Sequence, residues 1–267
     1  MKKENRKIAL VTGGSSGIGQ AVCESLVKRG AAVYEFSRRK EGIPEVNHVS
    51  VDVTDEEGVS RAVEAVLKKE GRIDILINCA GFGIGGAVEF TKTEDALSQF
   101  DVNFFGMARV TKAVIGSMRK EGGGRIVNIS SVAAPIPIPF QTFYSASKAA
   151  VNSYTAALAN ELRPYNITVC AVMPGDISTG FTKSRRKNME GDDVYQGRIS
   201  AGLSKMEKDE EEGMSPSVCG EYVAKIAFKK RVKPYYSIGF VYKLFCVLMK
   251  VLPARFSNMI VGRLYAG

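Results

Sequence analysis

KIALVTGGSSGIG, residues 7–19, is the stretch that decides the fold class of this chain. Residues 7–12 form a short apolar run that predicts a buried strand, and the glycines after it predict a tight turn. Residues 17–29 then carry apolar side chains at helical spacing. A strand, a glycine turn and a helix N-terminus together form a site for a pyrophosphate, because unpaired N–H groups and the helix dipole point at the ligand. This context indicates dinucleotide binding, which a glycine-rich string alone would not.

Strand and helix patterns continue to alternate after this stretch. The strands are near-continuous apolar runs, which indicates burial on both faces of a parallel sheet. We therefore predict an α/β fold, a Rossmann-like doubly wound parallel sheet of about seven strands with helices on both faces. The further predicted strands are residues 31–36, 48–53, 73–81, 124–131, 167–175 and 234–239, and the further predicted helices are residues 55–71, about 94–119 and 142 to about 163.

The alternation stops in residues 176–215, which are polar and show little hydrophobic period. A long irregular insert in a compact domain is usually a lid, a binding loop or a disordered segment. We expect one domain over residues 1–267, with residues 176–215 as a substrate lid.

Composition limits the class of protein and its compartment. Hydrophobic residues make up 45% and charged residues 24%, as in ordinary soluble globular proteins. The five cysteines are scattered without a C-x-x-C pair, which favours reduced thiols in a cytoplasm over disulfides or a metal site. We expect no signal peptide, because the first apolar run ends directly in a glycine turn. The single histidine, His48, is expected to be structural, so a histidine-based triad has little support.

The net charge of +9 belongs to the C-terminal part of the chain. Residues 225–267 hold nine Lys and Arg and no Asp or Glu. Because this charge is interleaved with apolar residues and no nucleic-acid-binding motif occurs, we do not expect nucleic-acid binding.

Residues 240–267 predict a helical extension, broken at Pro253 into two helices. Lys243 and Lys250 lie on one face of the first helix, which is too short to span a bilayer. Two interpretations stay open. The extension packs on the core, on a sister subunit or over the substrate mouth, or it lies on an anionic membrane surface. Its predicted apolar face consists of Phe240, Leu244, Phe245, Val247, Leu248 and Val251.

Four short motifs together resemble the short-chain dehydrogenase/reductase family. They are TGxxxGxG beginning at Thr12, NCAG at residues 78–81, YSASK at residues 144–148 and PG at residues 174–175. They occur in the order and spacing of that family, and the resemblance covers about residues 5–240. It implies a dehydrogenase or reductase that uses a nicotinamide dinucleotide, commonly as a homodimer or homotetramer.

The resemblance also implies four catalytic residues. Tyr144 matches the acid/base, and Lys148 matches the lysine that binds the nicotinamide ribose and lowers the pKa of the tyrosine. Ser131 matches the serine that hydrogen-bonds the substrate oxygen, and Asn103 matches the asparagine that supports a water leading to the lysine. Elementary chemistry agrees for the central pair. Residues i and i+4 share a helix face, and an ammonium near a phenol favours the phenolate.

The cofactor preference is predicted from the end of the second strand. NAD-preferring relatives carry an acidic residue at the position of Ser37, which Arg38 and Arg39 follow here. A guanidinium can bind a 2′-phosphate through two hydrogen bonds, so we expect NADP(H) rather than NAD(H). Glu35 is a carboxylate nearby but lies two positions too early. The full set of expected cofactor residues is Gly13, Ser15, Ser16, Gly17, Ile18, Gly19, Ser37, Arg38, Arg39, Asp52, Val53, Asn78, Ala80, Gly81, Tyr144, Lys148, Pro174, Gly175, Ile177 and Thr179.

The substrate is predicted to be lipophilic. Residues 132–143 are apolar and contain three prolines, and Met173 and Phe181 are expected to add apolar walls. A secondary alcohol or its ketone, hydroxysteroid-like or bile-acid-like, is the first expectation, and a 3-oxoacyl or other lipid ketone is the alternative. A non-catalytic nucleotide-binding or sensor protein is the alternative from another class. The basic run at residues 183–187 either attracts an acidic substrate group or is a solvated face.

Overall fold

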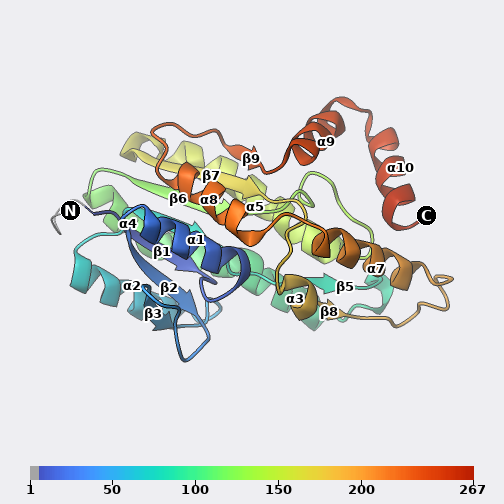
Figure 1. The fold of residues 1–267 in the computed structure, drawn as a ribbon, viewed down its shortest axis with the longest axis horizontal. Helices are drawn as coiled ribbons and strands as arrows, with labels where there is room; N and C mark the ends of the chain where they lie inside the picture. Colours follow the sequence, from blue (N-terminus) through green and yellow to red (C-terminus); the bar gives the residue numbers. More distant parts are fainter. Residues whose placement is uncertain (1–5) are drawn as a thin grey trace.

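A seven-stranded parallel sheet forms the centre of the protein in the computed structural model (Figure 1). The structure describes residues 6–267, so the first five residues of the predicted domain lie outside the described residues, as does the side chain of Lys250. The strand order is β3-β2-β1-β4-β6-β7-β9, and every neighbouring pair is parallel. The predicted doubly wound α/β fold is confirmed. The strands are β1 Ile8–Thr12, β2 Ala32–Ser37, β3 Asn47–Ser50, β4 Ile75–Asn78, β6 Gly124–Ile129, β7 Ile167–Met173 and β9 Tyr235–Ser237.

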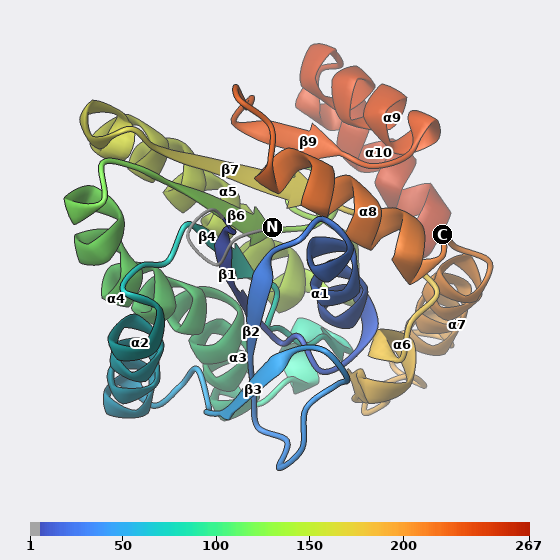
Figure 2. The same ribbon diagram turned by 60° about the vertical axis from the view of Figure 1, so that its left-hand side comes forward.

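Helices cover both faces of this sheet (Figure 2). One face packs against α1 (Gly17–Lys28) and α8 (Pro216–Ala227). The opposite face packs against α2 (Glu56–Glu70), α4 (Met107–Lys120) and α5 (Thr142–Leu162). Strands buried on both sides explain why the sequence shows continuous apolar runs there. Two single-turn 3₁₀ helices, Val88–Phe90 and Arg163–Tyr165, complete the connections.

The helix predicted over about 94–119 is interrupted by a π-helical turn in its middle. It consists of α3 (Thr93–Phe100), a π-helical turn (Asp101–Gly106) and then α4. A π-turn inside an α-helix is rare and occurs frequently at functional sites. Here it holds Asn103, so the backbone departs from α-geometry at a residue that the sequence assigns to the active site.

The insert predicted to be irregular contains regular structure, so that expectation was wrong. Residues 176–215 form α6 (Phe181–Ser184), β8 (Arg186–Lys187) and α7 (Arg198–Glu211), and β8 pairs with β5 (Ile84–Gly85). In α7, Ile199, Leu203 and Met206 are buried and lie at i, i+4 and i+7. The narrow apolar stripe is easy to miss because most other positions of this helix are polar or charged.

The two helices predicted in the C-terminal extension are present. They are α9 (Phe240–Val251) and α10 (Ala254–Tyr265), and they lie at the same end of the molecule as the lid (Figure 1). Their inner sides pack around Cys246 and Val261 against Ile136 from the loop after β6. The extension therefore lies at the end of the molecule that carries α7, while the opposite end carries β3 and α2 (Figure 1).

Candidate active site

A cleft of about 930 Å³ runs from the glycine turn after β1 to the lid helix α7. Its floor is formed at the carboxyl ends of β1, β4, β6 and β7, where ligands of open α/β sheets bind. One half of its wall carries the glycine turn and the end of β2, and the other half carries Tyr144, the loop after β6 and the lid.

The glycine turn leaves room for a ligand because the backbone packs without side chains. Gly13 has φ +67°, and a Cβ there would lie 2.9 Å from the Cα of Ala80. A Cβ on Gly19 would lie 2.1 Å from the carbonyl oxygen of Gly13. Thr12 accepts hydrogen bonds through Oγ1 from the N–H groups of Cys79 and Ala80, at 3.0 and 3.1 Å, and so joins β1 to the turn after β4. These residues fit the pyrophosphate of a dinucleotide at the N-terminus of α1.

The far end of the cofactor half carries Ser37, Arg38 and Arg39. The Arg38 guanidinium is exposed and lies 3.9 Å from Asp52. Glu35 does not compete for a ribose there, because its carboxyl is fully buried and contacts Nδ1 of His48. Nε2 of His48 lies 3.0 Å from the carbonyl oxygen of Arg39. His48 therefore links β3 to the segment that the sequence assigns to the 2′-phosphate.

Tyr144 and Lys148 lie one turn apart on α5 and both line the cleft. The Lys148 ammonium lies 5.8 Å from the centroid of the Tyr144 ring and donates a 2.9 Å hydrogen bond to the carbonyl oxygen of Ile129. Ser131 follows β6 and hydrogen-bonds Tyr144. The Phe181 ring, from the lid, packs 5.8 Å from the Tyr144 ring between centroids. The phenol is thus held between the sheet, its own helix and the lid.

Burial controls the protonation of this pair. It raises the pKa of Tyr144 to about 12, and the hydrogen bond with Ser131 offsets only part of that effect. It lowers the pKa of Lys148 to about 8. Tyr144 therefore holds its proton at neutral pH and can donate it. The Lys148 ammonium is directed at the Ile129 carbonyl, so the role of Lys148 in lowering the pKa of Tyr144 stays a prediction for the complex with the cofactor.

Asn103 lies behind the cleft rather than in its wall. Its side-chain oxygen accepts from the N–H of Phe82 at 2.9 Å, and its amide donates to the Phe82 carbonyl at 3.0 Å and to Ser147 at 3.2 Å. A Cβ on Gly81 would lie 3.0 Å from the Asn103 oxygen and 3.6 Å from the Lys148 nitrogen. Asn103 thus connects the turn after β4 to α5 beside the lysine, and its role toward a water stays a prediction.

Asn78 is placed differently from the other expected cofactor residues, which line the cleft. Its amide is buried in the sheet and donates to Thr111 at 3.0 Å and to Asn128 at 2.9 Å. The residues directly after Asn78, which are Cys79, Ala80 and Gly81, do line the cleft. The Asn78 side chain joins β4 to β6 and α4, and its role toward the cofactor stays a prediction.

The substrate half has apolar walls and two carboxyl groups. Of the expected residues, Phe181 lines the cleft, whereas Met173 is buried in the sheet. The sequence did not identify Asp176 and Glu210 as site residues, yet both line this half. The spacing of α7 could have located the lid helix, but nothing in the sequence places Glu210 near Tyr144. The apolar lining consists of Val132, Ala133, Ile138, Phe181, Met206 and Tyr265.

Three of the four cations in the basic run of the lid pair with carboxylates, and Lys183 is exposed. Arg185 is buried and pairs with Glu210. Lys187 pairs with Glu207 of α7 at 2.5 Å, and Arg186 lies 3.4 Å from Asp95 of α3. Each of these cations is matched by a carboxylate, so the run holds the lid together.

A dinucleotide cradle and a protonated tyrosine at one cleft define an NAD(P)-dependent oxidoreductase. A family model described as short chain dehydrogenase matches residues 7–190, which is more than half of the chain. The chain therefore belongs to the short-chain dehydrogenase/reductase family and is an enzyme of the dehydrogenase/reductase class.

Similar proteins agree with this assignment. A 3-ketodihydrosphingosine reductase of Bacteroides thetaiotaomicron is 43% identical over 227 residues, 84% of each chain. A short-chain dehydrogenase from Streptomyces avermitilis superposes with a TM-score of 0.85 at 29% identity, over 97% of this chain and 98% of that one. A 3-ketoacyl-(acyl-carrier-protein) reductase from Brucella melitensis, complexed with NADH, has a TM-score of 0.74 at 27% identity over 87% of this chain and 96% of that one. ElxO with NADP bound has a TM-score of 0.75 at 26% identity over 90% of this chain and 99% of that one.

Proposed function

We propose that this enzyme is an NADP(H)-dependent reductase that converts a lipophilic ketone into a secondary alcohol. The observation that carries the proposal is the position of Tyr144, Ser131 and Lys148 in the cleft, where the dinucleotide cradle meets the apolar half. A phenol that keeps its proton at neutral pH suits reduction, in which the substrate oxygen must gain a proton.

The chain's own groups have distinct tasks in this reaction. Bound NADPH supplies the hydride to the carbonyl carbon. The Ser131 hydroxyl donates a hydrogen bond to the carbonyl oxygen and orients it toward Tyr144. Tyr144 gives its proton to that oxygen as negative charge develops there, and the Lys148 ammonium stabilises the tyrosinate that forms. The lid and Phe181 limit the access of water, which strengthens each of these interactions.

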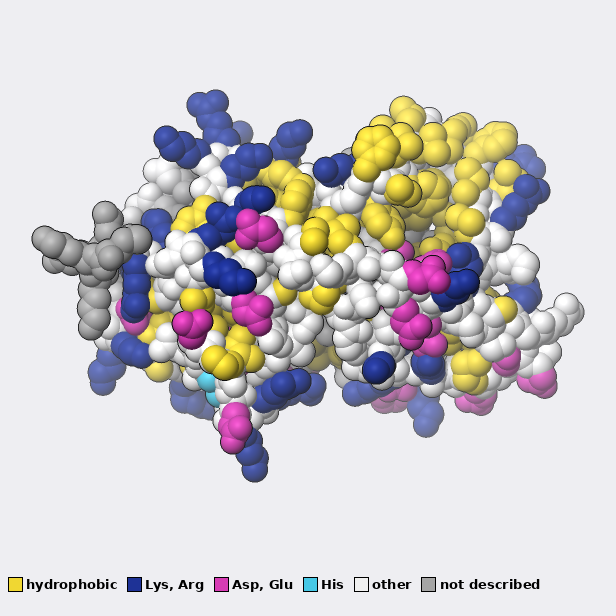
Figure 3. Space-filling view, in the orientation of Figure 1, with side chains coloured by type: hydrophobic (Ala, Val, Ile, Leu, Met, Phe, Trp, Pro, Cys, Tyr) yellow, Lys and Arg dark blue, Asp and Glu magenta, His cyan; other side chains and the backbone are white. Residues whose placement is uncertain are grey.

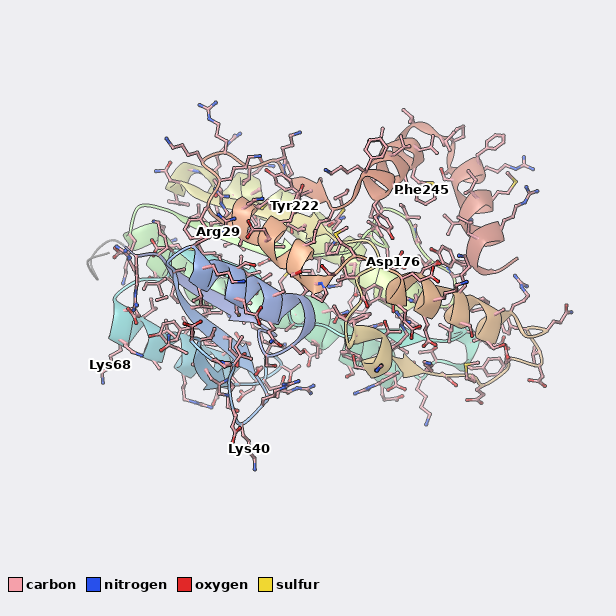
Figure 4. All side chains as sticks on the ribbon, in the orientation of Figure 1. Arg29, Lys40, Lys68, Asp176, Tyr222 and Phe245 are labelled. Carbon is pink, nitrogen blue, oxygen red and sulfur yellow. The ribbon has the colours of Figure 1, made fainter. Side chains whose placement is uncertain are left out.

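The preference for NADP(H) rests on the residues at the end of β2. Ser37 carries no negative charge to repel a 2′-phosphate, Arg38 is exposed beside Asp52, and Glu35 is buried. We expect Ser37→Asp/Arg38→Ala to lower the NADPH/NADH ratio of kcat/KM by at least about tenfold, because the bidentate charged contact is lost. Lys40→Ala, at the tip of the same loop (Figure 4), is the matched control and should leave the ratio unchanged. An unchanged ratio in the double variant would refute the assignment.

The substrate half favours a long-chain lipid ketone over a steroid or bile acid, which reverses the order expected from the sequence. Glu210 already pairs with Arg185, so Asp176 is the carboxyl group that a bile-acid carboxylate would approach, whereas a long-chain amino ketone would bring an ammonium group to it. The relative named 3-ketodihydrosphingosine reductase acts on a substrate of the latter kind. A 3-oxoacyl substrate shares the apolar chain but lacks the cation.

One substrate panel tests the reaction and the substrate class together. NADPH oxidation is measured with a long-chain amino ketone, a 3-oxoacyl thioester and a 3-ketosteroid, for the wild type and for Tyr144→Phe. We expect the largest kcat/KM with the amino ketone and loss of turnover in the variant. A larger kcat/KM with the steroid would overturn the substrate class. Dinucleotide binding without turnover of any ketone would favour a nucleotide-binding sensor instead.

The quaternary state and the location complete the proposal. We expect a cytoplasmic homodimer or homotetramer, as in similar proteins. Light scattering on the purified chain measures the mass, and a monomer at working concentration would contradict this expectation.

A further inference from the structure

The outer face of α9 exposes a continuous row of large apolar side chains. Phe240 is 80% exposed, Leu244 58%, Val247 60% and Val251 76%. These residues lie at i, i+4, i+7 and i+11, which places them on one helix face. In Figure 3 the apolar side chains gather over α9 and α10 at one end of the molecule. An apolar surface of this kind marks an interaction site.

The opposite side of α9 is already engaged, so the exposed face cannot turn inward. The hydroxyl of Tyr242 donates a 2.5 Å hydrogen bond to Asp176, and its ring covers Gly175, where a Cβ would lie 2.4 Å from the ring. Phe245, labelled in Figure 4, packs with the buried Cys246 and with Val261 of α10. The sequence predicts Phe245 on the same apolar face as Phe240 and Leu244. In the structure it instead packs inward, so this part of the prediction was wrong.

The charged residues of the extension itself have a single sign. Lys243, Arg255 and Arg263 are exposed on the extension. Residues 225–267 contain no Asp or Glu. A surface that is apolar in the middle and cationic at its edges is complementary to a bilayer with anionic headgroups. Within residues 6–267, no helix has the length and hydropathy needed to cross a membrane, and α9 and α10 have 12 residues each.

A second copy of the chain matches the charge of this face less well than an anionic bilayer does. A two-fold symmetric contact brings the same patch of both subunits together. Here it would place the cations of one extension against those of the other, without a carboxylate in residues 225–267 to neutralise them. Like charges at an interface oppose association.

We propose that the outer face of α9, with the cations of α9 and α10, docks the enzyme on an anionic lipid bilayer. The same extension reaches the active site, since Tyr265 lines the cleft and Tyr242 contacts Asp176 beside it. Docking therefore places the substrate half of the cleft next to the lipid phase. That consequence rests on the proposed lipid ketone, whereas the docking itself does not.

Sedimentation with lipid vesicles tests the docking on the full chain without substrate or cofactor. The vesicles are phosphatidylcholine with phosphatidylglycerol, and phosphatidylcholine alone. We expect binding to the anionic vesicles that weakens with salt. Leu244→Glu/Val251→Glu should lower the partition coefficient by at least about tenfold, because two apolar side chains leave the surface and two anions enter it.

A matched control separates the surface from a general change of charge. Leu97→Glu/Val218→Glu introduces the same two charges at apolar residues that are 64% and 52% exposed on α3 and α8. This control should bind vesicles like the wild type. Circular dichroism and light scattering are recorded for all three proteins to compare their folding and mass.

Each outcome decides the proposal. Loss of binding in the extension variant alone, with folding and mass unchanged, supports it. Absence of binding in the wild type, or an equal loss in both variants, overturns it. A fall in mass of the extension variant, without vesicle binding by the wild type, assigns the face to a second copy and also overturns it. Because no substrate is present, failure of docking leaves the reductase proposal standing, and absence of turnover leaves docking standing.

Discussion

The charged form of Lys148 should lower the free energy of unfolding below about pH 8. Replacing Lys148 with Met should remove this destabilisation. Its side chain is buried, with 6% exposure. Burial lowers its pKa from 10.5 to about 8. The native state must therefore hold a buried ammonium at neutral pH. We expect Lys148→Met to lack turnover and yet to change the free energy of unfolding in a way that depends on pH.

The magnitude follows from the two pKa values. Below about pH 8 both the folded and the unfolded chain bind the proton. Between about 8 and 10.5 the unfolded chain binds more protons, so the free energy of unfolding of the wild type rises with pH in this window. At 1.36 kcal/mol per pKa unit, burial of the charged lysine lowers the free energy of unfolding by about 3 kcal/mol at pH 7 and by about 1 kcal/mol at pH 9.5. The variant minus wild-type difference should fall by about 2 kcal/mol between these pH values.

Urea unfolding followed by far-ultraviolet circular dichroism measures this difference, since the chain has no tryptophan. Loss of the hydrogen bond to Ile129 adds an offset that does not depend on pH, so only the slope is diagnostic. Lys112→Met is the matched control, because Lys112 is exposed and paired with Glu56 at 2.8 Å. A Lys148→Met difference that stays constant from about pH 7 to 9.5 would refute the reasoning.

Three further substitutions test other parts of the site. Tyr144→Phe should lower kcat by about 10²- to 10⁴-fold while keeping the melting temperature, because it removes only the proton donor; a smaller loss of turnover would assign the proton to another group. Gly19→Ala should abolish dinucleotide binding measured by calorimetry, because its Cβ would lie 2.1 Å from the Gly13 carbonyl oxygen; unchanged affinity would show that the turn can move. Asn103→Ala should lower the free energy of unfolding by about 1–3 kcal/mol in urea, because the N–H of Phe82 loses its partner while its carbonyl keeps only Gln99, and a loss below about 0.5 kcal/mol would mean that water replaces the amide.

Much of the fold could be predicted because its signals are local. The glycine turn after β1 and the pairing of Tyr144 with Lys148 depend on residues a few positions apart, and their spacing determines their geometry. The apolar strands were recognisable because both faces of the sheet are covered, which leaves no polar alternation to confuse them. Strands that are apolar on both faces also require a layer of helices on each side of the sheet, so the layers could be predicted as well.

The lid and the back of the site could not be predicted in this way. The apolar stripe of α7 consists of only three large side chains. They are buried by contacts with Phe140 and Ala87, which lie far away in the sequence. The burial of Arg185 against Glu210 likewise depends on the packing of α7, so the basic run looked like a surface. The π-turn that holds Asn103 has no sequence signature of its own.

The sequence by itself determined the fold class, the family and most of the residues that line the cofactor half of the cleft, because each of these follows from spacing along the chain. Only the tertiary structure decided the protonation of Tyr144 and Lys148, the burial of Glu35 and the exposed face of α9. These properties depend on desolvation, which is the sum of contacts from segments far apart in the chain. Periodicity shows that a helix has an apolar face, but only packing shows whether that face is covered.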